Sequence, residues 1–189
     1  EKELIGKGVS TCATCDGFFY KNRVVYVVGG GDTAMEEASF LTKFASKIYL
    51  VHRRDQFRAS RPMQERVKQN PKIECLMNSN VTELQYDSNG LNGIVITNLL
   101  TGENKIHKTD GLFLAIGHTP NTQFLQGQLA LDEKGFIKTL NGTPETGIPG
   151  VFAAGDVQDS YYRQAITAAG SGCEAAIRVE RYLAELDLP

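Results

Sequence analysis

The segment 23–54 reads RVVYVVGGGDTAMEEASFLTKFASKIYLVHRR, and it decides the fold class. Its residues 24–28 are apolar and mostly β-branched, which predicts a strand buried on both faces of a parallel sheet. Three glycines follow, and the apolar residues after them recur at the spacing of a helix. The run KIYLVHRR then predicts a second strand. A strand, a glycine turn, a helix and a strand within about 30 residues make a βαβ unit, so the segment predicts an α/β fold.

The rest of the chain continues this pattern with further strands and helices. A basic stretch at 55–70 is predicted to be helical, and strands are predicted in KIECLMN, VTELQYD and LNGIVITNLL. The letters SNG between the last two predict a hairpin turn. The run GLFLAIGHTPN, at 111–121, predicts a strand that ends at a domain boundary. Beyond it, 150–156 predicts a short buried strand, and 160–186 predicts a final helix whose small residues can pack on a sheet.

The composition is that of an ordinary soluble protein. The 189 residues are 41% hydrophobic and carry a formal net charge of −2. No broad basic surplus points to nucleic acid, and no apolar run approaches the ~18 residues that span a bilayer. The first ten residues lack the apolar core of a secretory signal. Four cysteines in a chain of this length do not form a disulfide scaffold, which favours a reducing compartment, and we expect a cytoplasmic location.

Gly29, Gly31 and Ala34 form the pattern G-x-G-x-x-A between the first predicted strand and the helix. In dinucleotide sites the first glycine permits the tight turn, the second lets a pyrophosphate approach the backbone, and the alanine allows close helix–strand packing. The start of the helix also offers free N–H groups and the positive end of its dipole to the phosphates. A bare packing turn would show the same letters, but the flanking strands favour a dinucleotide site.

The end of the second predicted strand indicates which dinucleotide binds. An NAD site wants an acidic residue there, about 20 residues beyond the glycines, to bind the ribose 2′-hydroxyl. This chain instead has His52, Arg53 and Arg54, with Arg58 four residues later. Arginine side chains suit a 2′-phosphate, which a carboxylate would repel. Asp55 lies nearby, but Arg54 and Arg58 can pair with it, so the sequence predicts NADPH rather than NADH.

Two cysteines, Cys12 and Cys15, lie in the stretch STCATCDGFF at 10–19. Zinc needs four ligands, and the remaining Cys and His residues are scattered, which argues against a metal site. A purely structural disulfide is unusual in a cytosolic chain without other pairs. A redox dithiol fits better, because one cysteine must attack and a neighbour must resolve the mixed disulfide. Asp16 can hand a proton to a leaving thiolate. Since a hydride does not reduce a disulfide directly, an NADPH site together with a dithiol implies a flavin.

Several motifs together resemble the low-molecular-weight thioredoxin reductases. They are CATCDG at 12–17, GGGDTA at 29–34, HRRDQFR at 52–58, AIGHTPN at 115–121 and GVFAAGDVQDSYYRQAITAAGSGC at 150–173. The resemblance implies a Rossmann-like three-layer NADPH-binding domain with an inserted redox C-x-x-C, at 1–117. It further implies that 118–189 is the C-terminal portion of a second Rossmann-like domain, which binds FAD.

The resemblance also implies roles for individual residues. Cys12 and Cys15 would be the redox pair, and Asp16 the proton donor. No metal-binding residue is expected. The NADPH-binding positions would be Gly29, Gly31, Asp32, Thr33, Ala34, His52, Arg53, Arg54, Arg58, Ile116 and Gly117. The FAD-binding positions would be Gly155, Asp156, Arg163, Gln164 and Ala165.

The same resemblance implies an activity and a missing segment. NADPH and FAD would serve to reduce the Cys12–Cys15 disulfide, and the dithiol would then reduce thioredoxin, in a homodimer when the protein is full length. The family opens with a first G-x-G-x-x-G for the flavin pyrophosphate, which the residues before Cys12 cannot supply. The chain is therefore expected to be a fragment that binds NADPH but not FAD by itself. A flavoprotein reductase of a peroxiredoxin and a non-catalytic NADP(H)-binding module are the alternatives.

Overall fold

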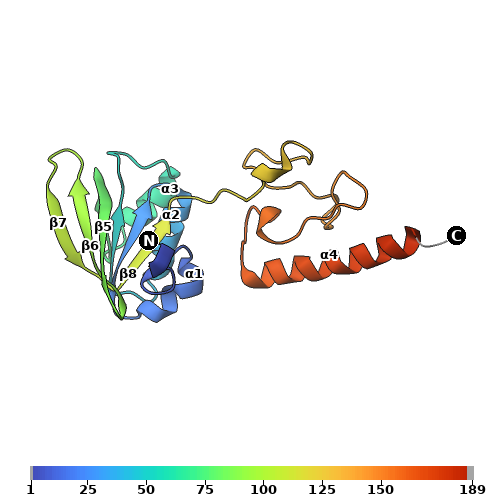
Figure 1. Ribbon diagram of the computed structural model, residues 1–189. Helices are drawn as coiled ribbons and strands as arrows, with labels where there is room; N and C mark the ends of the chain where they lie inside the picture. The colour runs from blue at the N-terminus through green and yellow to red at the C-terminus, as the bar shows by residue number, and fades with distance from the viewer. Residues whose placement is uncertain (1, 187–189) are drawn as a thin grey trace. The chain divides into compact units, whose positions relative to one another are not determined.

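The structure is a computed structural model that describes residues 2–186. The predicted domains were 1–117 and 118–189, so position 1 of the first and positions 187–189 of the second lie outside the described residues. The chain divides into two compact units between Gly117 and His118. Unit 1 contains both sheets and the helices α1–α3, and unit 2 contains the long helix α4 (Figure 1).

Unit 1 is built on a five-stranded parallel sheet with the order β1-β8-β2-β3-β4. The strands are β1 (Val9–Ser10), β2 (Val24–Gly29), β3 (Lys47–Val51), β4 (Ile73–Leu76) and β8 (Gly111–Ala115). The predicted βαβ unit is confirmed, because β2 leads through the glycines into α2 (Asp32–Leu41) and then into β3, its parallel neighbour. Since β3 and β8 flank β2 on opposite sides, the strand order reverses there, and such switch points are where open α/β sheets bind ligands.

Helices cover one face of this sheet (Figure 1). They are α1 (Ala13–Asp16), α2 and α3 (Arg61–Lys68); the short 3-10 helices η1 (Lys2–Leu4) and η2 (Gly17–Tyr20) flank β1 and α1. The inner face of α2 is apolar and fully buried, as its helical spacing predicts. Met35 and Leu41 from this helix pack in one core with Phe113 and Ile48 from the sheet.

A three-stranded antiparallel sheet covers the other face (Figure 1). Its strands are β5 (Ser79–Asp87), β6 (Gly90–Asn98) and β7 (Asn104–Lys108), paired in that order. Leu91 and Ile94 of β6 share a second core with Tyr26 and Leu112 of the parallel sheet. The predicted hairpin at SNG joins β5 to β6. Helices, parallel sheet and antiparallel sheet make three layers, which confirms the predicted α/β fold class.

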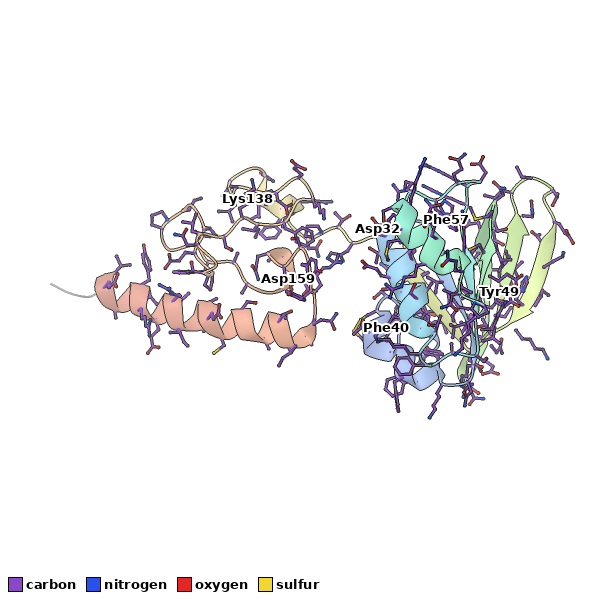
Figure 2. The ribbon with its side chains drawn as sticks, turned by 180° about the vertical axis from the view of Figure 1, so that it is seen from behind. Asp32, Phe40, Tyr49, Phe57, Lys138 and Asp159 are labelled. Carbon is purple, nitrogen blue, oxygen red and sulfur yellow. A yellow bond between two sulfur atoms is a disulfide. The ribbon has the colours of Figure 1, made fainter. Side chains whose placement is uncertain are left out.

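A hydrogen bond between Tyr26 and His107 connects the two sheets. Tyr26 stacks on Tyr49 with ring centroids 4.9 Å apart, and its hydroxyl lies 3.0 Å from Nδ1 of His107 in β7. Burial raises the pKa of Tyr26 to about 12, and Tyr49 and Glu74 add to the rise. The phenol therefore stays protonated at neutral pH and shares a hydrogen bond across the sheets. Figure 2 shows Tyr49 on the side of the antiparallel sheet and Phe40 on the helix side.

The helix predicted over 55–70 is shorter than expected. α3 begins at Arg61, after the N-cap Ser60, and has a proline in its first turn. The residues before it are held in another conformation, because the carbonyl of Gly30 accepts hydrogen bonds from the N–H groups of Arg58 (2.8 Å) and Ala59 (3.1 Å). The segment 55–60 is therefore a bend that is tied to the glycine turn.

Unit 2 corrects two predictions. The strand predicted at 150–156 does not form, because Phe152 makes only an isolated bridge with Glu145 and no strand of the described residues lies beside it. The short helices are η3 (Gln123–Leu125) and η4 (Gly155–Val157). The final helix forms as α4 (Ala165–Leu186), five residues later than the predicted start at 160, because the N–H groups of 161–163 bond to the Asp159 carboxylate. None of the residues of α4 is buried, so its small-residue face is not packed as predicted. Among the described helices, none is long and apolar enough to cross a bilayer.

Candidate functional site

A groove of about 500 Å³ lies at the carboxyl ends of β2, β3 and β8 in unit 1. Most of the residues that the sequence predicts for NADPH binding line it. They are Gly29, Gly31, Thr33, His52, Arg53, Arg54, Arg58, Ile116 and Gly117. Sequence reasoning missed the other lining residues, which are Val28, Gly30, Val51, Ser79, Asn80 and Ala115.

The two predicted glycines of the turn are needed for different reasons. A Cβ at Gly29 would lie 2.7 Å from the Cβ of Ala34 and would press on the carbonyl of Ala115, so the fold itself requires glycine there. A Cβ at Gly31 would meet nothing within 4 Å, and the residue has an extended backbone with φ −97° and ψ −178°. The fold leaves room for a side chain at Gly31, next to the first turn of α2. A pyrophosphate that approaches the backbone would need this room.

The turn 52–58 is attached to the glycine turn. Nε2 of His52 lies 3.0 Å from the carbonyl oxygen of Gln56, and the His52 ring packs on Phe57 with centroids 5.1 Å apart. His52 is buried and fills the space beside Gly30. Its ring therefore holds the turn in shape. Together with the bond from the Arg58 N–H to Gly30, this contact fixes the backbone from which the arginines extend.

The arginines of this turn carry unpaired charge. Arg53, Arg54 and Arg58 are exposed, and among the described residues none of them forms an ion pair. The pairing of Asp55 with Arg54 and Arg58 that the sequence allows does not form among the described residues. An exposed ion pair contributes little stability, so the hydration of the two separate charges can outweigh it. The residues that line the groove include three arginines and no carboxylate, and this balance favours an anionic ligand.

Two further positions predicted for NADPH binding do not line the groove. Asp32, labelled in Figure 2, accepts hydrogen bonds at Oδ1 from the N–H of Ser60 (2.8 Å) and from its hydroxyl (3.0 Å). Its carboxylate thus joins the start of α2 to the start of α3. Ala34 is fully buried against Gly29. Both residues shape the walls of the groove from behind.

Cys12 and Cys15 form a disulfide at the start of α1. Cys12 is the N-cap of this helix, and its Sγ accepts a hydrogen bond from the N–H of Cys15 at 3.1 Å. Cys12 is half-buried, whereas Cys15 is exposed. Among the described residues, no group of three His, Cys, Asp or Glu side chains could hold a metal ion. Because the two sulfurs are bonded across two intervening residues, the pair can exchange electrons as a disulfide and a dithiol.

Ser10 connects the disulfide to Asp16, and sequence reasoning missed it. The Ser10 hydroxyl donates to Oδ2 of Asp16 at 2.7 Å and accepts from the N–H of Cys12 at 3.1 Å. Ser10 is buried at the end of β1, while Asp16 is half-buried at the end of α1. The hydrogen bonds hold the Asp16 carboxyl on the same turn as the sulfurs. A polar residue two positions before the C-x-x-C was the available signal.

An aromatic patch lies beside the disulfide, formed by Phe18, Phe19, Phe40 and Phe44. Phe18 is 66% exposed and Phe19 is 73% exposed, although both are large apolar side chains. Phe18 contacts Phe19 and Phe44 edge to face, with centroids 6.3 and 6.0 Å apart. Exposed apolar patches of this kind mark contact surfaces. The letters GFF at 17–19, which follow Asp16, are the signal that sequence reasoning left unused.

In unit 2, the residues predicted for flavin binding lie at the start of α4. The N–H of Gly155 in η4 donates to the hydroxyl of Ser171 at 2.9 Å, which places η4 against the first turns of α4. Asp156 is exposed in η4, and Gln164 directly precedes the helix. An exposed carboxylate can accept hydrogen bonds from ribityl hydroxyls, and a helix N-terminus offers N–H donors. The carboxylate acceptor and the N–H donors together fit one part of a flavin.

Asp159 organises the loop before α4 and was not predicted. Figure 2 shows it beside the start of the helix. Its carboxylate accepts from the N–H groups of Tyr161 (3.0 Å), Tyr162 (2.8 Å) and Arg163 (2.8 Å) and from the hydroxyl of Thr167 (3.1 Å). Burial raises the pKa of Asp159, but these hydrogen bonds favour the charged form and lower it below its ordinary value. They also hold Arg163 in a left-handed conformation, φ +49°.

Comparison with known families gives a match over most of the chain. Residues 1–172 match the family described as pyridine nucleotide-disulphide oxidoreductase. Thioredoxin reductase 2 of Arabidopsis thaliana is 56% identical over 184 residues, which cover 95% of this chain and 48% of the plant protein. The thioredoxin reductase of Mycolicibacterium smegmatis is 52% identical over 187 residues, 99% of this chain and 60% of the relative. The chain thus spans about half to three fifths of the length of these curated relatives.

Solved structures give the same result. The thioredoxin reductase of Streptococcus pyogenes superposes with a TM-score of 0.89 at 40% sequence identity, over 95% of this chain and 58% of that one. The thioredoxin reductase of Giardia duodenalis has a TM-score of 0.86 at 46% identity, over 97% of this chain and 60% of that one. Sequence and structure therefore agree on the relatives of this chain.

Proposed function

The chain belongs to the pyridine nucleotide-disulphide oxidoreductase family, and from this membership we propose that it is the NADPH-binding, disulfide-carrying part of a thioredoxin reductase. The complete protein would use NADPH to reduce a disulfide of thioredoxin, with FAD as its second cofactor. One observation carries the proposal. A single compact unit holds both an arginine-lined groove at the switch point of its sheet and a C-x-x-C disulfide near exposed aromatic rings.

The groove supports NADPH as the reductant. The open space at Gly31 would receive the pyrophosphate, near the N-terminal end of α2. Arg53 and Arg54 would bind the 2′-phosphate, since neither is paired with a carboxylate among the described residues. Ile116, at the end of β8, is 68% exposed and offers an apolar surface to the adenine or nicotinamide ring. These contacts bind and orient the nucleotide.

Residues of unit 2 support a place for FAD. When it is bound, FAD supplies the chemistry that links a hydride donor to a disulfide. Asp156 would bind the ribityl hydroxyls, and Arg163 with the start of α4 would face the ring. Asp159 would hold this loop in place through the hydrogen bonds described above.

The dithiol chemistry can be followed at the protein residues. Reduction of the Cys12–Cys15 disulfide takes up two electrons and two protons and gives two thiols. One thiol gives up its proton, and the resulting thiolate attacks the partner disulfide, which forms a mixed disulfide and leaves one partner sulfur as a thiolate that takes up a proton. The second cysteine then loses its proton and attacks its neighbour's sulfur, which breaks the mixed disulfide, re-forms the Cys12–Cys15 bond and releases the partner as a dithiol once its second sulfur is protonated. Asp16, held by Ser10, would give a proton to the departing thiolate. The oxidised pair is then restored.

The aromatic patch supports a protein partner. An exposed cysteine next to exposed Phe18 and Phe19 can meet the disulfide of another protein across an apolar contact. Thioredoxin is the partner proposed, in keeping with the names of the relatives. The homodimer stays a prediction from the resemblance, and the cytoplasmic location stays a prediction from the cysteine content.

Single cysteine variants of the full-length protein test this function. We expect Cys12→Ser and Cys15→Ser each to abolish NADPH-driven reduction of thioredoxin, because exchange needs both sulfurs. Loss of flavin absorbance on addition of NADPH should persist in both variants, since that step needs neither sulfur. Cys75→Ser is the matched control, because Cys75 is a free, half-buried cysteine in β4. Reduction of thioredoxin that survives in Cys12→Ser would contradict the proposed function.

A further inference from the structure

The first residues of β5 form one wall of the groove, although they are far in sequence from its other walls. The chain leaves β4 and turns at Asn78, which has a left-handed conformation with φ +50°. The N–H of Asn78 donates to the carbonyl of Arg54 at 3.1 Å, and the N–H of Ser79 donates to the carbonyl of His52 at 2.9 Å. These bonds fix Ser79 and Asn80 beside the turn that carries the arginines.

Ser79 and Asn80 both line the groove, but only Asn80 has a side chain available for a ligand. Ser79 is buried, and its hydroxyl donates to the carbonyl of Met77 at 2.8 Å. Asn80 is exposed, and its carboxamide forms no hydrogen bond with another described residue. It pairs with Thr97 in the β5–β6 ladder through its backbone. Since asparagine is disfavoured in strands, the fold does not explain this residue.

The positive charge of the groove explains why a neutral carboxamide suits position 80. All charged side chains that line the groove are arginines, and aspartate has the same shape as asparagine with a negative charge. An aspartate at position 80 would line the same groove as the arginines, would compete for them and would repel a phosphate dianion. A carboxylate in such a place also accepts hydrogen bonds from ribose hydroxyls, as in NAD-binding sites. Asparagine avoids the repulsion and can still hydrogen-bond to a nucleotide.

We propose that Asn80 is a specificity-determining residue that contacts the adenosine end of the bound nucleotide and keeps the wall beside the 2′-phosphate neutral. The proposal rests on the proposed NADPH site. It separates two effects on affinity. The arginines act on NADPH alone through its 2′-phosphate, whereas the carboxamide acts on both NADPH and NADH. A negative charge placed at position 80 weakens the binding of NADPH and does not weaken that of NADH.

Calorimetric titration of the full-length protein with NADPH and with NADH tests this assignment. Asn80→Asp should weaken NADPH binding about ten-fold or more through repulsion of the 2′-phosphate, with NADH binding unchanged or tighter. Asn80→Ala should weaken both nucleotides by the same factor, about three- to ten-fold, because a hydrogen bond to the shared adenosine is lost. Asn89→Asp is the control, since it adds the same charge at the exposed β5–β6 turn, outside the groove. It should leave both affinities unchanged.

The outcomes distinguish this proposal from the NADPH site on which it rests. If Asn80→Asp weakens neither nucleotide, or weakens both equally, the role of Asn80 is refuted. The double variant Arg53→Ala, Arg54→Ala reports on the site itself, and it should weaken NADPH about ten-fold or more while NADH barely changes. If this double variant affects neither nucleotide, the nucleotide site is wrong and the role of Asn80 falls with it. Circular dichroism of each variant confirms that the fold is kept.

Discussion

Replacement of Gly31 by alanine separates the requirements of the fold from those of the ligand. Gly31 is the N-cap of α2 with an extended backbone, and an added Cβ would meet no atom within 4 Å. Alanine is a poorer N-cap than glycine by roughly 0.5 kcal/mol. It also restricts the unfolded chain, which stabilises the folded state by about 0.4–1 kcal/mol where the conformation is allowed. The two effects oppose each other, so we expect a net change in the free energy of unfolding within about 0.5 kcal/mol.

The same methyl group should reduce nucleotide affinity. It would occupy the space at the glycine turn that a pyrophosphate needs for close approach to the backbone. We expect the Kd for NADPH to rise about ten-fold or more, which corresponds to roughly 1.4 kcal/mol. The Kd for NADH should rise by the same factor, because both nucleotides share the pyrophosphate. Titration calorimetry gives the two constants, and urea denaturation of the same samples gives the stability.

Gly29→Ala is the counterpart of this variant. Its Cβ would lie 2.7 Å from the Cβ of Ala34, so the variant is overpacked. We expect it to lose about 1–3 kcal/mol of stability. A stable Gly31→Ala variant that binds NADPH as tightly as the wild type would refute the placement of the pyrophosphate at this turn. A strong loss of stability in Gly31→Ala would instead refute the account of the open space.

Two further predictions concern stability. Tyr26→Phe removes the hydrogen bond to His107 and should lower the free energy of unfolding by about 1 kcal/mol in urea denaturation. Tyr86→Phe, at an exposed site of β5, is the control and should change this free energy by less than about 0.5 kcal/mol. Equal losses in the two variants would count against the hydrogen bond between the sheets. Because folding lowers the pKa of Asp159, its charge stabilises the folded state above the ordinary value of 3.8, and this contribution is lost as the pH falls through the lower folded-state pKa. The difference in Tm between wild type and Asp159→Asn should therefore shrink from about pH 5 downward, and a difference that stays constant to about pH 2 would contradict the prediction.

The central βαβ unit could be predicted because its signals are local. A β-branched run, three glycines and an apolar helix face follow one another within 23–54. β7 was missed because Asn104–Lys108 has only one aliphatic residue, and an edge strand needs no apolar run. The start of α3 was misplaced because the bonds that hold 55–60 come from Gly30, a residue distant in sequence. The strand predicted at 150–156 failed because hydrophobicity alone cannot supply a neighbouring strand.

The candidate site shows the same division. The glycine turn and the arginine turn carry recognisable residue types in one continuous segment, so they could be named from the sequence. Asn80 comes from a strand of the other sheet, and only the three-dimensional fold brings it to the groove. Ser10 has no chemical signature of its own, because its role depends on the neighbours Cys12 and Asp16.

The bonds from Arg58 and Ala59 to the carbonyl of Gly30 have a consequence for protein engineering. An attempt to change the nucleotide specificity of such a site from NADPH to NADH would replace the segment 52–58 by the acidic loop of an NAD-dependent enzyme. That graft would remove the His52 ring from beside Gly30 and change the donors that hold the glycine turn. Because these contacts join the two loops, we expect a transplant that carries both to keep phosphate binding and a transplant of one alone to lose it.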